Sequence, residues 1–341
     1  MKKLSVIFSV LMATLLLLSM VVSCAQKAEE PVVLRMNLAP PPGDPMTVEC
    51  EAMAARFNER AGPQYTIQVY PGATLAAPPE MLDAVMAGNI EIGLLPLGAY
   101  GGADNRLNAI EFPFLYNNIY ALEAAQGPDI VKLLNEEIFE VKFNQKMLGP
   151  FHTMFLELVS TKKPIKTMED FDGLLIGSLS PTISAITELL GGSSAIVPWM
   201  EIAGAMEKGV VDASFQGPVW IVVGGLTDVC KYVTFTAIVP TSYGMNINLD
   251  VYNAMPKDVQ NILLEEAERA CSAMNKVFTG EYLKSPEVFA SKGLEVYTLP
   301  KAERERWHQA LMPYIEENFA SWGEFGKKFK AIADKANAAN P

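Results

Sequence analysis

Two residue types that carry much metal and redox chemistry are scarce in this chain of 341 residues. It has only two histidines, His152 and His308, which leaves too few ligands for a histidine-based metal site. Apart from one cysteine near the start, Cys50, Cys230 and Cys271 lie far apart, and no CxxC spacing occurs. This spacing argues against a metal site or a dense disulfide framework, and favours burial as small apolar side chains.

Positive charge is scarce as well. The chain has 27 Lys and Arg against 39 Asp and Glu, so its formal net charge is −12 at pH 7. Nucleic-acid binding needs a basic surface, which this balance does not supply. No arginine occurs between Arg106 and Arg269, and neither a phosphate-binding loop nor a GxSxG motif is present. The sequence therefore offers no familiar set of catalytic residues.

Apolar residues are abundant, and the length suits two domains. At the N-terminus, two lysines precede the apolar stretch Leu4–Val22, which leads into Val-Val-Ser-Cys24. This order is typical of a bacterial lipoprotein signal. We expect residues 1–23 to be a signal peptide, Cys24 to be lipidated, and residues 24–31 to form a tether. The chain would then lie outside the cytoplasm, anchored to a membrane; an uncleaved membrane anchor with an incidental cysteine is the alternative.

A short pattern occurs twice. Glu80–Glu91 reads EMLDAVMAGNIE and Glu201–Asp212 reads EIAGAMEKGVVD, with Glu, Ala, Gly and an acid at matching positions. A helix that ends at a glycine and leads into a short buried strand gives this spacing. Two copies predict two similar α/β lobes with a ligand cleft between them. We expect the final acids to hold the junction between strand and loop rather than to bind a ligand.

Strands and helices alternate along most of the chain, which predicts α/β lobes with largely parallel sheets. Ser180 and Pro181 form a good helix start. The expected strands are 32–37, 65–70, 90–95, 174–176, 195–197 and 210–215, and the expected C-terminal helices are 257–282, 301–318 and 323–339. We assign residues 32–153 plus 243–282 to lobe I, and 154–242 plus 283–335 to lobe II.

One longer segment carries a family resemblance. Lys163–Ile176 reads KPIKTMEDFDGLLI and resembles the "kPi-t-eDlkGlki" stretch of solute-binding proteins of TRAP transporters, the DctP-like family. Tyr70-Pro71-Gly72, Phe112-Pro113-Phe114 and Glu201–Asp212 resemble other segments of that family in the same order. The resemblance implies a periplasmic-binding-protein-like clamshell of two α/β lobes, with long helices that span both. It also implies binding of a small organic solute, a two-subunit ion-driven membrane permease as partner, and neither a cofactor nor catalysis.

The chain departs from the family at the ligand clamp. The family's motif continues with an arginine that holds the ligand carboxylate through two hydrogen bonds, and here Gly177 takes that place. After Asp212, where many relatives have another acid, this chain reads Ala-Ser-Phe-Gln. We therefore expect a neutral or weakly polar ligand rather than a dicarboxylate, and no metal. Gly177→Arg is expected to raise the affinity for small carboxylates. Whether Glu157 or His152 replaces the arginine stays open.

Ligands of two-lobed α/β proteins lie beyond the carboxyl ends of the strands. The predicted ligand contacts are Asn37, Tyr100, Glu157, Gly177, Ser178, Phe215, Gln216, Trp220, Tyr243 and Asn246, the last two in a turn expected at 243–246. Three of them have an alternative role: Asn37 could form an Asx-turn, Tyr100 could anchor its loop, and Trp220 could pack in the core.

Glu157 stands out because it interrupts the apolar run Phe155–Val159. A carboxylate there must be paired, protonated or directed at a polar cleft. An enzyme that uses Glu157 and Asp212 as a carboxylate pair is the alternative function of another class. A ligand-sensing receptor of the same fold is a further alternative.

Overall fold

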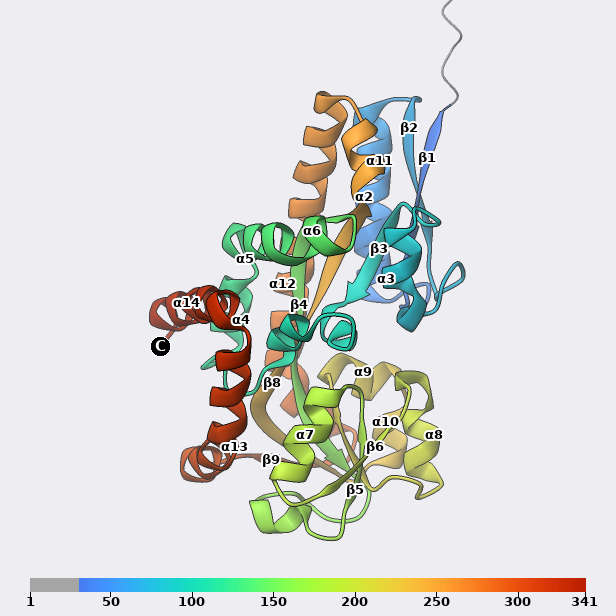
Figure 1. The fold of residues 1–341 in the computed structure, drawn as a ribbon. Coiled ribbons are helices and arrows are strands. Elements are labelled where there is room, and N and C mark those ends of the chain that lie inside the picture. The colour runs from blue at the N-terminus through green and yellow to red at the C-terminus, as the bar shows by residue number, and fades with distance from the viewer. Residues whose placement is uncertain (1–30) are drawn as a thin grey trace, which may run out of the picture.

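A single sheet of nine strands runs through both lobes of the computed structural model, which describes residues 31–341 (Figure 1). The strand order is β2-β1-β3-β8-β4-β7-β5-β6, and β9 pairs with β8. The strands are β1 (Val32–Asn37), β2 (Tyr65–Tyr70), β3 (Ile92–Pro96), β4 (Gln145–Ser160), β5 (Leu175–Ser178), β6 (Ser193–Ile196), β7 (Ala213–Gln216), β8 (Tyr232–Asn248) and β9 (Glu295–Thr298). The predicted signal peptide and lipidation site, Cys24, lie outside the described residues.

The upper lobe in Figure 1 is built on the parallel strands β2-β1-β3. Helix α2 (Pro45–Ala61) begins at Asp44, whose carboxylate accepts a hydrogen bond from the backbone N–H of Met46 at 2.8 Å. It ends at Gly62. Helix α3 (Pro78–Met86) packs against β3. The predicted strands 32–37 and 65–70 are confirmed.

The lower lobe repeats this arrangement with the parallel strands β7-β5-β6. Helix α7 (Pro181–Leu189) begins at Ser180, whose Oγ accepts the backbone N–H of Ile183, which confirms the predicted start.

The remaining short helical segments are η1 (Leu97–Tyr100), η2 (Asn105–Glu111), α4 (Ile119–Ala125), α5 (Pro128–Leu134), η3 (Asn135–Phe139), α6 (Glu140–Lys142), η4 (Met168–Phe171), η5 (Trp199–Glu201), α8 (Ile202–Glu207), α9 (Pro218–Val223), α10 (Leu226–Val229) and α11 (Leu249–Ala254).

The repeated sequence pattern forms equivalent joints in the two lobes. Its glycines have φ values of 71° and 68°, which glycine adopts without a steric penalty. Glu91 accepts the backbone N–H of Arg35 in β1 at 2.8 Å and pairs with its guanidinium group. Asp212 accepts the backbone N–H of Leu175 in β5 at 3.0 Å and pairs with Lys162. Each acid therefore fixes the neighbouring parallel strand, which confirms its predicted structural role.

The centre of the sheet differs from the prediction. The long strands β4 and β8 are antiparallel to one another and pass through both lobes, so the parallel pairs are limited to β2-β1-β3, β7-β5-β6 and β8-β9. The prediction of a turn at 243–246 is wrong, because these residues lie within β8. Tyr243 pairs with Pro96 and Phe151, and Asn246 pairs with Met147, all within β8 and its neighbours. Most of β8 is buried, including the polar residues Asn246 and Asn248, so its polar positions do not mark an exposed face.

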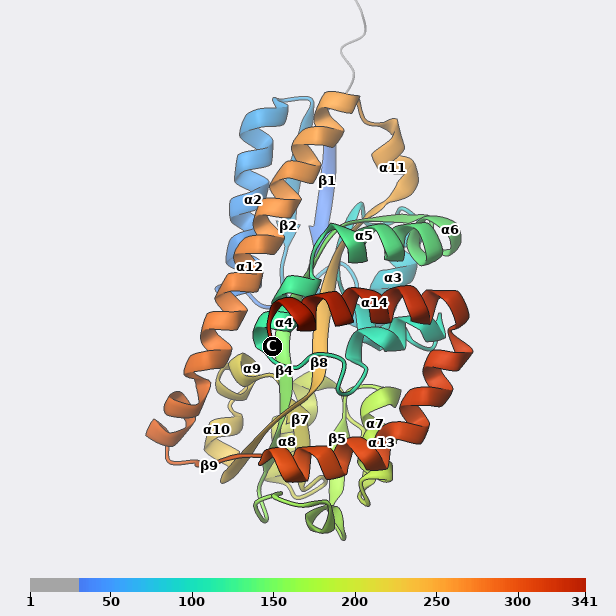
Figure 2. The ribbon, with the colours of Figure 1, turned by 90° about the vertical axis from the view of Figure 1, so that its left-hand side faces the viewer.

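Three helices complete the links between the lobes (Figure 2). Helix α12 (Lys257–Ser291) spans both lobes as expected, α13 (Lys301–Ser321) covers the lower lobe, and α14 (Gly323–Ala339) returns to the upper lobe. Phe325 and Phe329 of α14 are buried in the core that includes β1 and β3. The packing of α14 thus differs from the assignment of residues 283–335 to lobe II. Within residues 31–341, every helix is too short or too polar to traverse a bilayer.

Candidate functional site

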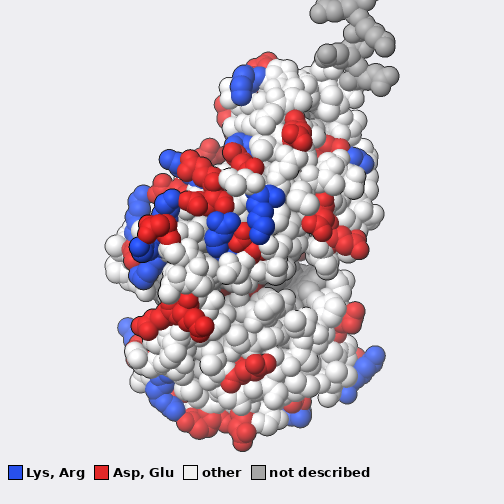
Figure 3. All heavy atoms as spheres, viewed as in Figure 1, with Lys and Arg blue, Asp and Glu red and all other residues white. Residues whose placement is uncertain are grey.

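A groove of about 240 Å³ lies between the two lobes. The loop after β1 contributes Pro41 from the upper lobe, and η5, α8, α9 and α10 form the opposite wall. The lining residues are Pro41, Trp199, Met200, Ala203, Trp220, Val223, Gly224 and Leu226. Figure 3 shows a furrow between the lobes bordered mainly by uncharged atoms, whereas charged side chains gather over the left part of the upper lobe. The groove is therefore uncharged and mainly apolar.

Two tryptophans dominate this groove. The rings of Trp199 and Trp220 meet edge to face with centroids 6.1 Å apart. Trp220 continues inward to Tyr243, at 6.4 Å between centroids, so it joins the groove to the aromatic interior. Gly217 allows this position, because a Cβ there would lie 2.7 Å from the Trp220 ring. Met200 lies at the rim with 77% of its surface exposed, which leaves it available to a ligand.

A buried carboxylate connects the lobes beside the carboxyl end of β5. Glu111, at the end of η2, accepts hydrogen bonds from Ser180 Oγ at 2.7 Å and Thr241 Oγ1 at 3.3 Å. Burial raises the pKa of Glu111, although both hydroxyls oppose this shift. Its side chain lies directly against Gly98, where a Cβ would be 2.2 Å from Glu111 Cδ. Sequence reasoning missed Glu111; the signals were an acid before an apolar run and a glycine-rich loop.

Glu157 is fully occupied by the protein itself. In β8, residues 235–238 bulge out opposite Glu157, and Ala237 has a φ of 51°. The carboxylate accepts hydrogen bonds from Tyr282 Oη and Thr236 N, both at 2.5 Å, and from Ala237 N at 3.2 Å. Burial outweighs these donors and raises the pKa of Glu157 to about 7. Glu157 thus stabilises the bulge, and donors of the chain itself occupy both of its oxygens.

The position of the missing arginine is closely packed. A Cβ on Gly177 would lie 2.8 Å from Ile202 Cδ1 and 3.3 Å from Val211 Cγ2. The backbone carbonyl of Gly177 accepts a hydrogen bond from Ser214 Oγ at 2.6 Å, and Gln216 Nε2 donates to that same Oγ at 2.9 Å. Gln216 Oε1 is buried without a partner among the described residues. A side chain at position 177 would therefore meet α8 before it reached the groove.

Several other predicted contacts serve the scaffold. The amide group of Asn37 donates to Ala76 O at 2.9 Å and accepts Leu75 N at 3.2 Å, so it fixes the loop before α3. Tyr100 Oη donates to Pro78 O at 2.5 Å. The other scaffold contacts are those of Asn246, whose Nδ2 donates to Gln145 Oε1; Ser178, whose Oγ donates to Ser180 O; and Phe215, which is buried in the lower core with Ile176 and Ile186.

Neither open candidate replaces the arginine as a cation. His152 is buried in β4, with its Nε2 3.0 Å from Thr279 Oγ1. Burial lowers the pKa of His152 to about 3, so the ring is neutral at physiological pH. Glu157 is an acid. The structure does not favour the alternative carboxylate pair either, because Asp212 is bound to Leu175 N and Lys162.

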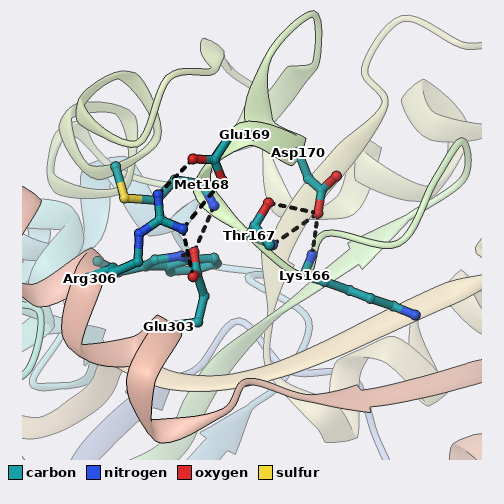
Figure 4. Close-up of polar contacts among 8 residues, drawn as sticks. Lys166, Thr167, Met168, Glu169, Asp170, Glu303 and Arg306 are labelled. Carbon is teal, nitrogen blue, oxygen red and sulfur yellow. Dashed lines mark hydrogen bonds and ion pairs between the residues drawn. The ribbon is translucent and has the colours of Figure 1, made fainter.

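Hydrogen bonds within the segment that carries the family resemblance, and from it to α13, hold that segment in place (Figure 4). Asp170 Oδ2 accepts the backbone N–H groups of Lys166 and Thr167 at 2.8 Å and 2.9 Å. Glu303 of α13 accepts the backbone N–H of Met168 at 3.0 Å, also shown in Figure 4. The segment therefore fixes the approach to β5 against α13, and contributes no side chain to the interlobe groove.

The fold and the interlobe groove define a two-lobed solute-binding protein. Residues 36–321 match the DctP family, described as bacterial extracellular solute-binding protein, family 7. The chain belongs to this family, whose members are extracytoplasmic binding proteins of TRAP transporters. This confirms the expected family and fold class, and it favours a transport receptor over the carboxylate enzyme.

The sequence relatives are distant. The C4-dicarboxylate-binding periplasmic protein DctP of Rhodobacter capsulatus is 24% identical over 298 residues, which cover 84% of this chain and 86% of that protein. The ectoine-binding periplasmic protein TeaA of Halomonas elongata is 26% identical over 174 residues, about half of each chain. These distances leave room for different ligands within one family.

Solved structures share the fold. A TRAP periplasmic solute-binding protein from Anaerococcus prevotii with bound α/β-D-glucuronate has a TM-score of 0.83 and 20% identity, covering 91% of this chain and 99% of that one. The sugar acid binding protein DctPAm from Advenella mimigardefordensis, in complex with galactonate, has a TM-score of 0.81 and 17% identity, covering 90% and 99%. At such identities the likeness concerns the fold alone.

Proposed function

We propose that this protein delivers a small organic solute without a clamped carboxylate to a TRAP permease, and that the interlobe groove binds this solute. The observation that carries the proposal is the charge at the groove. No Lys or Arg lines it within residues 31–341, and Gly177 stands where the family places its arginine. Glu111 adds a buried carboxyl group to the contact between the lobes, outside the lining of the groove. A dianion would enter this environment without a compensating charge.

The groove favours a compact ligand with a flat or branched apolar part. Its volume of about 240 Å³ lies below the usual range for drug-sized ligands. Trp220 lines it but is only 8% exposed, Trp199 offers the more accessible ring, and Met200 and Val223 are exposed at its rim. Because Pro41 of the upper lobe faces these residues, a bound ligand would touch both lobes and favour their closed arrangement. Relatives named for C4-dicarboxylates and ectoine show the range of solutes in the family.

A binding screen tests the proposal. Thermal shift followed by calorimetry would compare succinate, malate and glucuronate with neutral aromatic and aliphatic solutes of similar size. We expect the neutral set to contain the tightest ligand and Met200→Ser to weaken it. Micromolar binding of succinate or malate by the unaltered protein would overturn the assignment of ligand class.

We further propose that the protein is held at the membrane by a lipid on Cys24. The support is the N-terminal order of lysines, apolar stretch and Val-Val-Ser-Cys24. Metabolic labelling with a radioactive fatty acid should label the unaltered protein and not Cys24→Ser. Equal labelling of both, or of neither, would overturn the anchor.

A further inference from the structure

The two central strands have irregular backbone where they cross between the lobes (Figure 2). Pairing of β4 with β7 of the lower lobe begins at Glu157, and pairing of β8 with β3 of the upper lobe begins at Tyr243. Between these points the ladder of β4 and β8 shifts register twice. Met154 and Ala237 have φ values of 102° and 51° there, which residues with a Cβ rarely adopt. Strained backbone of this kind is concentrated at segments that switch conformation, which supports a hinge at this crossing.

Glu157 joins three of the crossing elements at this hinge. It lies in β4, and its Oε2 accepts the backbone N–H groups of Thr236 and Ala237 in the β8 bulge. Its Oε1 accepts Tyr282 Oη of α12 at 2.5 Å. Tyr282 stays protonated, because burial and the neighbouring carboxyl group raise its pKa well above the usual range. A change in the charge of Glu157 therefore acts on β4, β8 and α12 together.

The surroundings of Glu157 do not neutralise its charge. Within residues 31–341 the donors that bind it are all uncharged, and Gln216 of β7 lies opposite it in the ladder. Arg304 of α13 faces the same bulge, but its guanidinium group donates to the carbonyl oxygens of Thr236 and Ala237, at 3.4 Å and 3.1 Å. Burial outweighs the donors and raises the pKa of Glu157 to about 7. Both forms of the acid are therefore present near neutral pH.

We propose that the charge of Glu157 sets the angle between the lobes: the neutral acid retains the arrangement described here, and the carboxylate favours a more open one. In the described arrangement an ionised Glu157 is a buried anion that only neutral groups bind. Bending β4 and β8 apart at the bulge would admit water to it, which lowers the cost of its charge. Release of the proton to solvent and opening of the lobes therefore favour one another. The proposal concerns closure itself and does not depend on the ligand class proposed for the groove.

Small-angle X-ray scattering as a function of pH tests the proposal without a ligand. We expect the radius of gyration of the unaltered protein to increase from about pH 4.5, where a hydrated glutamate begins to ionise, and to level off above about 7. Glu157→Gln mimics the neutral acid and should keep the low-pH radius throughout. A constant radius in the unaltered protein, or the same increase in Glu157→Gln, would overturn the proposal.

Tyr282→Phe tests the same contact from the side of α12. It removes a donor that stabilises the carboxylate, so the pKa of Glu157 should rise further. The pH at which the radius levels off should then move upward by roughly one unit. A hydrogen bond with a merely structural role would change the radius equally at every pH. Such a uniform change, or an unmoved end point, would count against the proposal.

Two other titratable groups near the lobe boundary need matched control variants. The ring of His308 in α13 lies 4.7 Å from that of Phe114, whose backbone N–H donates to Ile238 O in the bulge at 3.0 Å. Glu111 is the buried acid that binds Ser180. His308→Gln and Glu111→Gln should both keep the increase of the radius with pH. Loss of the increase in either variant would assign it to that residue and overturn the role of Glu157.

Discussion

Glu111 of the upper lobe accepts a hydrogen bond from Ser180 of the lower lobe at 2.7 Å. This contact joins the end of η2 to the first turn of α7, beside the carboxyl end of β5. Because both residues are buried, the bond is shielded from water and contributes more than an exposed one. The relative position of the lobes therefore depends partly on a buried polar contact between them.

The Glu111 contact should be measurable as lobe separation. Glu111→Ala removes the acceptor for Ser180 and Thr241, so we expect a loss of about 1–3 kcal/mol in the free energy of unfolding. Small-angle X-ray scattering should show a larger radius of gyration. Glu111→Gln keeps an acceptor oxygen and should retain the compact form. Identical scattering for Glu111→Ala and the unaltered protein would contradict this role.

The buried carboxyl of Glu157 should make stability depend on pH. Burial raises its pKa from 4.5 to about 7, a shift that corresponds to about 3 kcal/mol. The folded state holds the extra proton, so this stabilisation is fully present below pH 4.5 and is lost as pH rises through 7. Glu157→Gln should remove this contribution. Urea unfolding of both proteins at pH 4.5 and pH 8 checks it; an equal difference between them at both pH values would refute the shift.

A substitution at Met200 should change ligand affinity without changing the stability of the fold. Its side chain is 77% exposed at the groove, so Met200→Ser should change the free energy of unfolding by less than about 0.5 kcal/mol. A ligand that covers it would lose apolar contact, so its affinity should fall severalfold. Calorimetry with the tightest ligand of the screen provides the measurement. Val48→Ser is the matched control, because Val48 lies on the exposed face of α2, away from the groove. An unchanged affinity in Met200→Ser would place the ligand elsewhere.

The structure revises the expected effect of an arginine at position 177. Because a Cβ there would lie 2.8 Å from Ile202, Gly177→Arg alone should lower the free energy of unfolding by about 1–3 kcal/mol. Gly177→Arg combined with Ile202→Ala opens space for the guanidinium group. We expect only the double variant to gain affinity for succinate over the unaltered protein, as measured by calorimetry. Tighter succinate binding by the single variant would show that Ile202 yields readily.

Local signals predicted the outer parts of the fold. The strand Tyr65–Tyr70 and the helix start at Ser180 follow from alternation and capping, which depend on neighbouring residues. The long strands β4 and β8 did not follow, because both of their faces are buried, polar residues included, and their pairing joins residues far apart in the chain. Helix α12 continues nine residues beyond the predicted Tyr282, through Pro286, a residue type that usually ends or kinks a helix.

Prediction of the site was limited in a different way. Trp220 was among the expected contacts and lines the groove, but its partner Trp199 was not among them, and Glu111 was missed. Asn37 and Glu157 were selected for their position after or within strands. Their side chains are bound to residues 38 and 79 positions further along the chain, Leu75 and Thr236 among them. Such distant partners cannot be inferred from local sequence.

The return of α14 to the upper lobe has a mechanical consequence. The chain crosses the boundary between the lobes in β4, β8, α12 and the α13–α14 connection. Lys328 and Lys335 tie the last crossing to Glu137 and Asp129 at 2.6 Å and 2.7 Å. Four chain crossings at separated points restrict rotation of one lobe about the long axis of the molecule, but they still permit a hinge motion. A solute in the groove would therefore be enclosed by a hinge motion of one lobe toward the other, with little lateral displacement.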